Sequence, residues 1–416
     1  MSAAALSAPQ RRRLVAHLAR SLGLDRLGLV EDAVQVACLR ALEHWPAEGE
    51  PANPAGWLYR VAWRFAIDQL CGAQRLEACP DDDGELPAAL AVAAPEGRFA
   101  GELDDDELAL LFAACHPAVP EASQVALALR ASCGLDLKTI ADGLLCSEAA
   151  LAQRLARARV ALAGVALEAP AGTELALRRD AVLATLMLMF QAGWHAGGRL
   201  GAREDGDPDA LTLSWEAIRL ARALAAHPVA AHADADALAA LLLLHGARLS
   251  GRLDEAGDIV PLAGQPRDGW DLGMVRMGLV HLQASQRAER LSRWHLLAGI
   301  AAEHATATDY ASTDWPAIVR WYELLVSLDP SAAPRLGHAI ALAEGGAPAL
   351  ARERLLALLP DTPQALRAHT LAALARAHER LGETDAARAR LQEAILHAPH
   401  DADARLLARR AAALGA

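Results

Sequence analysis

Apolar residues recur every three or four positions along nearly the whole chain, and no long stretch alternates with a period of two. Spacing of this kind places apolar side chains on one face of a helix, whereas a half-buried strand requires alternation. The pattern therefore predicts an all-α protein. Apolar runs such as Ala181–Phe190 are shorter than the roughly 20 residues that cross a bilayer, so no membrane-spanning helix is predicted.

The helical pattern divides the chain into two small helical domains, residues 1–75 and 108–165, and a long helical segment, residues 166–416. Residues 76–107 interrupt it with Asp, Gly and Pro and carry a net charge of −10, out of −12 for the chain. The two small domains are near neutral, which leaves nucleic-acid binding open. The acidic segment is either a solvated flexible tether or a strand that mimics nucleic acid and occupies a basic channel of a partner.

Two amphipathic helices are predicted in residues 1–75. The first, Val30–Trp45, directs Asp32, Gln35 and Arg40 away from its apolar face. That apolar face consists of Val30, Val34, Ala37, Ala41, Leu42 and Trp45. The second, Asn53–Leu70, begins with a capping Asn53 and with Pro54 at the first helical position. Its apolar stripe consists of Leu58, Val61, Ala62 and Phe65.

The stretch "DLKTIADGLLCSEAALAQRLARAR", residues 136–159, predicts two short helices joined by a tight turn. Ser147 is a favourable N-cap for the second helix. The predicted buried positions are Leu137, Ile140, Ala141 and Leu144 in the first helix and Leu151, Leu155, Ala158 and Leu162 in the second. Gln153 and Arg157 fall on the opposite face with Arg154 at its edge, as suits a helix that enters the major groove of DNA. The alternative is an ordinary helical hairpin with a solvated arginine face.

The last part of the chain contains repeats. One unit matches the spacing of a tetratricopeptide (TPR) repeat of about 34 residues. Its matching positions are Leu371, Leu374, Ala375, His378, Ala387, Leu391, Ala394 and Pro399. A looser unit runs from Trp294 to Pro330, and a shorter helix pair ends at Pro360. Stacked helix pairs form a solenoid whose surface suits a protein or peptide ligand, unless the segment is only a structural cap.

No catalytic motif is present: phosphate loops, dinucleotide-binding fingerprints, zinc-protease motifs and nucleophile elbows are all missing from the sequence. We therefore expect neither an enzyme nor a bound cofactor. The six cysteines form no C-x-x-C pair, which is typical of reduced thiols in a cytoplasmic protein. Cys115 and His116 could hold zinc, but adjacent ligands lack the usual spacing, so a core or turn role is favoured. The basic N-terminal stretch lacks the apolar segment of a secretory signal.

The chain resembles the extracytoplasmic-function (ECF) group of sigma-70 factors. The stretches "EDAVQVACLRALEHWP" and "NPAGWLYRVAWRFAIDQL" are similar to sigma region 2, and "FAACHPAVPEASQVALALR" and "CSEAALAQRLARAR" to region 4. The stretches "AVLATLMLMFQAGW" and "TDWPAIVRWYELLVSLDP" resemble landmarks of the ECF group that carries a long helical C-terminal extension.

The resemblance implies that the chain binds core RNA polymerase and promoter DNA. It places the helix of residues 31–45 on the polymerase, the helix of residues 53–70 at the −10 element and residues 137–162 at the −35 element. The acidic linker would lie in the basic RNA-exit path. The implied polymerase contacts are Asp32, Gln35 and Arg40. The implied DNA contacts are Arg60, Trp63, Arg64, Lys138, Gln153, Arg154, Arg157 and Arg159.

The predicted −10 helix departs from the family, which usually has a run of basic and polar residues there. This chain has Trp63 and Phe65 on either side of Arg64, and Cys71 and Gly72 follow where arginines are expected. Missing phosphate contacts weaken DNA binding and flatten its salt dependence. The two aromatic rings either stack on unpaired bases or pack within the domain.

The function predicted from the sequence is that of a sigma factor with a fused C-terminal regulatory domain. The alternative is a sigma-derived interaction scaffold that has lost promoter binding. The C-terminal segment could mask region 4 or brace it, and the weak basic charge of the sigma regions favours bracing, because a poor DNA binder gains from pre-organisation.

Overall fold

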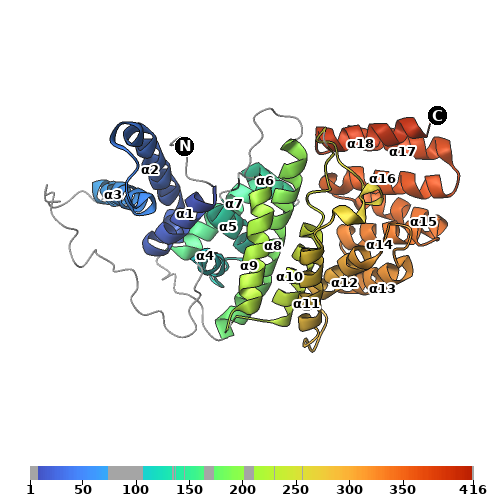
Figure 1. Ribbon diagram of the computed structural model, residues 1–416, viewed down its shortest axis with the longest axis horizontal. Coiled ribbons are helices and arrows are strands. Elements are labelled where there is room, and N and C mark those ends of the chain that lie inside the picture. Colours follow the sequence, from blue (N-terminus) through green and yellow to red (C-terminus); the bar gives the residue numbers. More distant parts are fainter. Residues whose placement is uncertain are drawn as a thin grey trace. The chain divides into compact units, whose positions relative to one another are not determined.

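The computed structural model describes residues 8–73, 106–133, 135, 137–144, 146–163, 173–200, 210–228, 230–254 and 256–414. The predicted all-α class is confirmed, because these residues form eighteen α-helices and four short 3-10 turns, shown in Figure 1. Within the described ranges, extended pairing is limited to one antiparallel bridge between Leu253 and Ile259. Nearly all of the acidic segment 76–107 lies outside the described residues.

The chain folds into two compact units. The first contains the described residues up to Ile140 and those within Glu148–Thr185 and His227–Ala230. The second contains the described residues of Ala141–Ser147 and those from Leu186 to the end, except those within His227–Ala230. Helices α6 (Leu137–Gly143) and α8 (Thr173–Leu200) each contribute residues to both units.

The first unit is built around α1 and α4. Helix α1 packs against α2, α3, α4 and α5, and α5 packs against α7. The helices are α1 (Ala8–Leu22), α2 (Leu27–Glu48), α3 (Pro54–Ala73), α4 (Asp106–Ala114), α5 (Glu121–Cys133) and α7 (Glu148–Leu162), with a 3-10 turn, η1, at Leu24–Arg26. The two predicted small domains thus contribute helices to one unit.

Helix α4 is buried on all sides, and every residue from Leu108 to Cys115 is less than 5% exposed. Burial this complete is expected for a helix that is apolar all round. Glu107, in the same helix, is also buried, and its carboxylate lies 3.9 Å from the guanidinium of buried Arg12 on α1. The last two residues of the predicted acidic linker, 106 and 107, therefore belong to this central helix.

Local signals set the ends of α2 and α3. The side-chain oxygen of Asn53 accepts a hydrogen bond from the backbone N–H of Gly56 at 2.9 Å, so the predicted cap of α3 is confirmed. Helix α2 ends at Glu48 and is capped by Gly49, whose N–H donates to the carbonyl of Trp45 at 2.9 Å. Gly49 has a φ of 87°, a conformation that glycine adopts without a steric penalty.

The second unit is a succession of helices in which each packs on its neighbours, from α9 to α18 (Figure 1). The helices are α9 (Ala210–Ala226), α10 (Ala233–Gly246), α11 (Leu272–Ser285), α12 (Arg293–Thr306), α13 (Trp315–Leu328), α14 (Ala332–Glu344), α15 (Pro348–Leu358), α16 (Gln364–Arg380), α17 (Thr384–Leu396) and α18 (Asp401–Ala413). The 3-10 turns are η2 (Leu262–Gly264), η3 (Arg267–Gly269) and η4 (Leu359–Asp361).

Most of the predicted repeat positions lie at the packing surfaces of these helices, whereas Pro399 is exposed in the turn after α17. Fully buried repeat positions are Leu371, Leu374, Ala375, Ala387, Leu391 and Ala394, all on α16 and α17. His378, which stands where the repeat usually has an aromatic residue, is half-buried and hydrogen-bonds to Glu383. The looser repeat unit corresponds to α12 and α13, and the shorter pair to α14 and α15.

Candidate nucleic-acid and polymerase interface

Helix α2 carries the predicted polymerase contacts on its solvent side. Asp32, Gln35 and Arg40 are exposed, as the helical pattern predicted. Leu39 and Leu42 are also exposed, by 52% and 44%. Asp32, Gln35, Leu39 and Leu42 follow one another at helical spacing and form a single mixed stripe, which we call the α2 stripe.

The opposite side of α2 is core. The four buried positions that the sequence predicted there are Val30, Val34, Ala37 and Ala41. The prediction that Leu42 belongs to this core face is wrong, because periodicity places a residue on a face of a helix but does not supply the neighbour that covers it. The sequence analysis also did not identify Leu39 as an exposed apolar residue on the solvent side of α2. The available signal was an apolar residue one turn after Gln35, on the polar side of the predicted helix.

Helix α3 presents Arg60 and Arg64 to solvent. The Trp63 ring is half-buried and stacks on Tyr59, with ring centroids 6.0 Å apart and planes 22° apart. Tyr59 in turn meets His17 of α1 edge-on at 5.0 Å, and burial raises the pKa of Tyr59. Trp63 therefore has a packing partner inside the unit while part of its surface stays accessible.

Helix α7 has two distinct sides. Leu151, Leu155, Ala158 and Leu162 are buried, which confirms the predicted core stripe. The outward side carries the predicted groove residues: Gln153, Arg157 and Arg159 are exposed, and Arg154 is half-buried. For the first predicted helix the prediction holds in part: Ile140 and Ala141 of α6 are buried, but Leu137 is 37% exposed and Leu144, which follows α6, is half-buried.

A basic hollow of about 460 Å³ brings together predicted residues from two helices. Lys138 and Arg159, both exposed, line it together with Arg130, which sequence reasoning missed. Glu148 supplies one carboxylate there. Arg130 is paired with Glu31, outside the lining, so Lys138 and Arg159 against Glu148 leave the hollow with a positive balance, which suits a phosphate group.

Arg130 is held in place by two hydrogen bonds. Its guanidinium donates to the carbonyl of Leu135 at 2.9 Å and to the carboxylate of Glu31 on α2 at 2.8 Å. The only signal in the sequence was a basic residue in the last turn of a helix, a position that commonly serves the helix dipole. Its pairing with Glu31 spans 99 positions and depends on the tertiary fold.

Beside α4, Cys115 and His116 serve core and turn roles. Cys115 is fully buried, and burial raises the pKa of its thiol to about 12. The Nδ1 atom of His116 accepts a hydrogen bond from the N–H of Ala118 at 3.0 Å, within the turn that follows α4. Buried Arg178 of α8 donates to the carbonyl of Phe112 at 3.1 Å.

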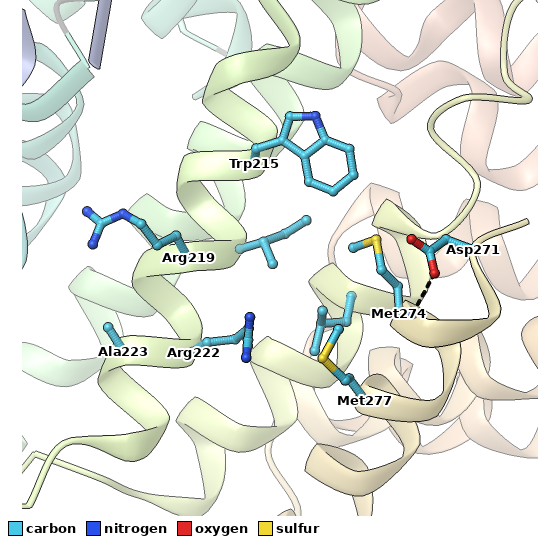
Figure 2. A pocket seen from close by; sticks show the side chains of 9 residues that line it. Trp215, Arg219, Arg222, Ala223, Asp271, Met274 and Met277 are labelled. Carbon is cyan, nitrogen blue, oxygen red and sulfur yellow. Dashed lines mark hydrogen bonds between the residues drawn. The ribbon is translucent and has the colours of Figure 1, made fainter. Parts of the chain in front are cut away.

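The second unit has a separate hollow of about 550 Å³ between α9 and α11, shown in Figure 2. Trp215 and Arg222 of α9 lie across from Met274 and Met277 of α11. Trp215 is 45% exposed and Met277 38%. The hollow is therefore open, partly apolar and rimmed by two arginines, of which Arg219 pairs with Glu216. Asp271, at its edge, is occupied in capping α11, where it accepts from the N–H of Met274 at 3.0 Å.

Comparison with known proteins identifies two parts of the chain. Residues 10–76 match sigma-70 region 2, and residues 178–286 match a family of unknown function, DUF6596. An uncharacterized protein of Rhizobium meliloti (strain 1021) is 38% identical over 330 residues, which cover 77% of this chain and 75% of that protein. No solved structure matches the chain. None of the described helices is long and apolar enough to cross a membrane.

Region 2 is a domain of a non-enzymatic family, and it implies binding to core RNA polymerase and a role in transcription initiation. The helices with the α2 stripe and with Arg60 and Arg64 lie within the matched residues 10–76. This chain belongs to the family of the Rhizobium meliloti protein and carries a sigma-70 region 2 domain joined to a DUF6596 domain.

Proposed function

We propose that the chain is an ECF-type sigma factor that directs core RNA polymerase to specific promoters, with a fused C-terminal regulatory domain. The observation that carries the proposal is the combination of a matched region 2 with a second helical element, α6–α7, whose outward face is polar and basic. A chain with region 2 and a second DNA-reading element would contact two promoter elements.

The α2 stripe is the proposed polymerase-binding surface. Exposed leucines beside charged groups favour a protein partner over solvent, because Leu39 and Leu42 gain free energy by leaving water. Asp32, Gln35 and Arg40 would then set the orientation of the docked helix through polar contacts.

Helix α7 is the proposed reader of the −35 element. Gln153 and Arg157 lie one turn apart on its exposed face, and these residue types bond base edges in the major groove. Lys138 and Arg159 in the basic hollow would contact phosphates and fix the register of the helix.

Helix α3 is the proposed reader of the −10 element through Arg60, Arg64 and the accessible part of Trp63. The alternative function is a sigma-derived scaffold that binds polymerase without reading a promoter. The small number of exposed arginines on α3 supports this alternative, because phosphate contacts supply much of the affinity for DNA. For the second unit we propose TPR-like repeats and a protein or peptide ligand, and the open hollow beside Trp215 is a surface that fits one.

The test is reconstituted transcription with core polymerase and genomic promoter fragments. The full chain should bind the polymerase and start transcripts at defined sites. Reversing the charges of the α2 residues, with Asp32→Arg and Arg40→Glu, should abolish polymerase binding while helical circular dichroism stays unchanged. The matched control exchanges charges at exposed Glu353 and Arg354 of α15 and should bind normally.

Undiminished polymerase binding by the Asp32→Arg, Arg40→Glu variant would contradict the assignment of α2. Polymerase binding by the wild-type chain without transcripts at any defined site would favour the scaffold instead.

A further inference from the structure

Two arginines in the second unit share one tryptophan ring. The guanidinium carbons of Arg248 and Arg252 lie 4.5 and 4.6 Å from the centroid of Trp194. Both arginines follow α10, in the connection that leads to α11. Arg252 also donates to the backbone carbonyl of Trp194.

A third arginine lies in the same connection. The guanidinium carbon of Arg267 lies 4.1 Å above the ring of Trp270. The N–H of Asp271 donates to the carbonyl of Ala247 at 2.8 Å, so the chain next to Trp270 meets the chain next to Arg248. We call Arg248, Arg252, Arg267 and Trp270 the arginine–tryptophan cluster.

Within the described residues, no carboxylate pairs directly with the arginines of the cluster. Among the described residues, no carboxylate forms an ion pair within 4.0 Å of any of its three arginines, although Asp309 and Asp403 act on Arg267 and Arg252 from farther away. The neutral oxygen of Gln265 lies 3.5 Å from Arg248. All three guanidinium nitrogens of Arg267 are buried without a hydrogen-bond partner in the described structure.

Two further polar atoms near these arginines also have no hydrogen-bond partner among the described residues. The indole nitrogen of Trp270 is buried and has no hydrogen-bond partner among the described residues, and the whole residue is only 5% exposed. The Nδ1 atom of His304 is likewise buried and unpartnered in the part of the chain that the structure describes. Burial, followed by the charges of Arg248 and Arg267, lowers the pKa of His304 to about 4, so the histidine is neutral at physiological pH.

Burying cations and donors without partners is costly, and native structures normally satisfy such groups. Burial and the neighbouring arginines lower the pKa of Arg248 to about 10, which still leaves it charged near neutral pH. Guanidinium groups bind the oxygens of phosphates and carboxylates through paired hydrogen bonds. We propose that the arginine–tryptophan cluster is a binding site for a small oxyanion that carries phosphate or carboxylate groups.

The experiment uses the full chain and thermal unfolding at constant ionic strength. The three probes are inorganic phosphate, pyrophosphate and citrate, each compared with chloride. Binding to the folded state should raise the Tm of the wild-type chain by at least about 2 °C at saturating probe. Isothermal titration of the wild-type chain with the same probe should show saturable binding.

Arg267→Gln should lose most of this gain in Tm, because it removes the unpartnered guanidinium. In chloride, its Tm should equal or exceed that of the wild-type chain, since an uncompensated buried cation has been removed. Arg320→Gln, at an exposed position of α13, is the matched control and should keep the wild-type gain.

A response to phosphate or pyrophosphate without one to citrate would identify a phosphate ligand, and the reverse would identify a carboxylate. The proposal is overturned if none of the three probes shows saturable binding to the wild-type chain. The proposal is also overturned if Arg267→Gln folds and its Tm rises with the probe as much as that of Arg320→Gln. If Arg267→Gln does not fold, Arg248→Gln takes its place in the same comparison with Arg320→Gln.

Discussion

At the scale of single residues, burial separates the side chains that hold α7 in place from those that face solvent. Leu151 and Leu155 are almost completely buried, whereas Gln153 and Arg157 between and beyond them are exposed. Substitutions on the exposed side should therefore change binding while they leave stability nearly unchanged.

Arg157→Ala is the sharpest test of the proposal that α7 reads DNA. If Arg157 bonds a base edge, the variant should lose about 1–3 kcal/mol of binding free energy and relax the preference at one base pair. If Arg157 contacts phosphate, the loss should be uniform across sequences and the salt slope should fall by about one. Binding measured over a range of salt concentrations, with Arg320→Ala as control, distinguishes these outcomes. A variant equal to wild type at every salt concentration would mean that α7 does not read DNA.

Cys115 should be unreactive in the folded protein. Its thiol has a pKa of about 12 against an ordinary value of 9.0, because burial disfavours the thiolate. Iodoacetamide at pH 8 should leave Cys115 unlabelled until the chain is denatured, as measured by mass spectrometry of its peptide. Since the folded pKa is the higher one, the stabilising contribution of this group is present below pH 9 and is lost as the pH rises toward 12. Rapid labelling of native Cys115 would show that the core around α4 opens readily.

At the scale of secondary-structure elements, one carboxylate joins α14 to α16. Glu344 of α14 is buried, and its oxygens accept from Arg376 at 2.7 Å and from Arg380 at 2.6 Å. These hydrogen bonds hold the pKa of Glu344 below its usual value even though burial alone would raise it. Arg376 also reaches Glu379, so the connection is a small network.

Glu344→Gln should lower the free energy of unfolding by about 2 kcal/mol, because it weakens two charge-assisted hydrogen bonds. Urea unfolding followed by circular dichroism measures the change. Glu353→Gln, on the exposed side of α15, is the matched control and should remain within about 0.5 kcal/mol of wild type. Equal stabilities of the two variants would show that Glu344 does not join the helices energetically.

At the scale of the whole molecule, α8 contributes to both units. Its first part, up to Thr185, belongs to the first unit, where Arg178 is 2% exposed and bonds the backbone of α4. The sequence-based domain boundary after residue 165 therefore separates α4 from a helix that helps to cover it.

This arrangement affects truncation. A fragment of residues 1–164 should have a lower Tm than one of residues 1–185. Only the longer fragment retains the part of α8, up to Thr185, that belongs to the first unit and whose Arg178 bonds the backbone of α4. If the C-terminal half braces α7, the proposed reader of the −35 element, both fragments should support less promoter-dependent transcription than the full chain. Transcription is meaningful only for a fragment that circular dichroism and gel filtration show to be folded and soluble. A folded fragment more active than the full chain would instead indicate masking.

The fold class and the helix faces were predictable from the sequence because they depend on local periodicity. The buried stripe of α7, the Asn53 cap of α3 and the repeat positions of α16 and α17 all follow from residue types at helical spacing. The exposure of Gln153 and Arg157 followed from the same reasoning, since a residue opposite a buried stripe usually faces solvent.

Only the tertiary structure decided which distant groups meet. The sequence by itself determined that Leu42 is apolar and in helical register, but its exposure depends on whether another helix covers that face. The pairing of Arg130 with Glu31, and the gathering of Arg248, Arg252 and Arg267 in one connection, join residues with no local relation. Periodicity describes a single helix, whereas ion pairs and buried clusters require two or more elements to be brought together in space.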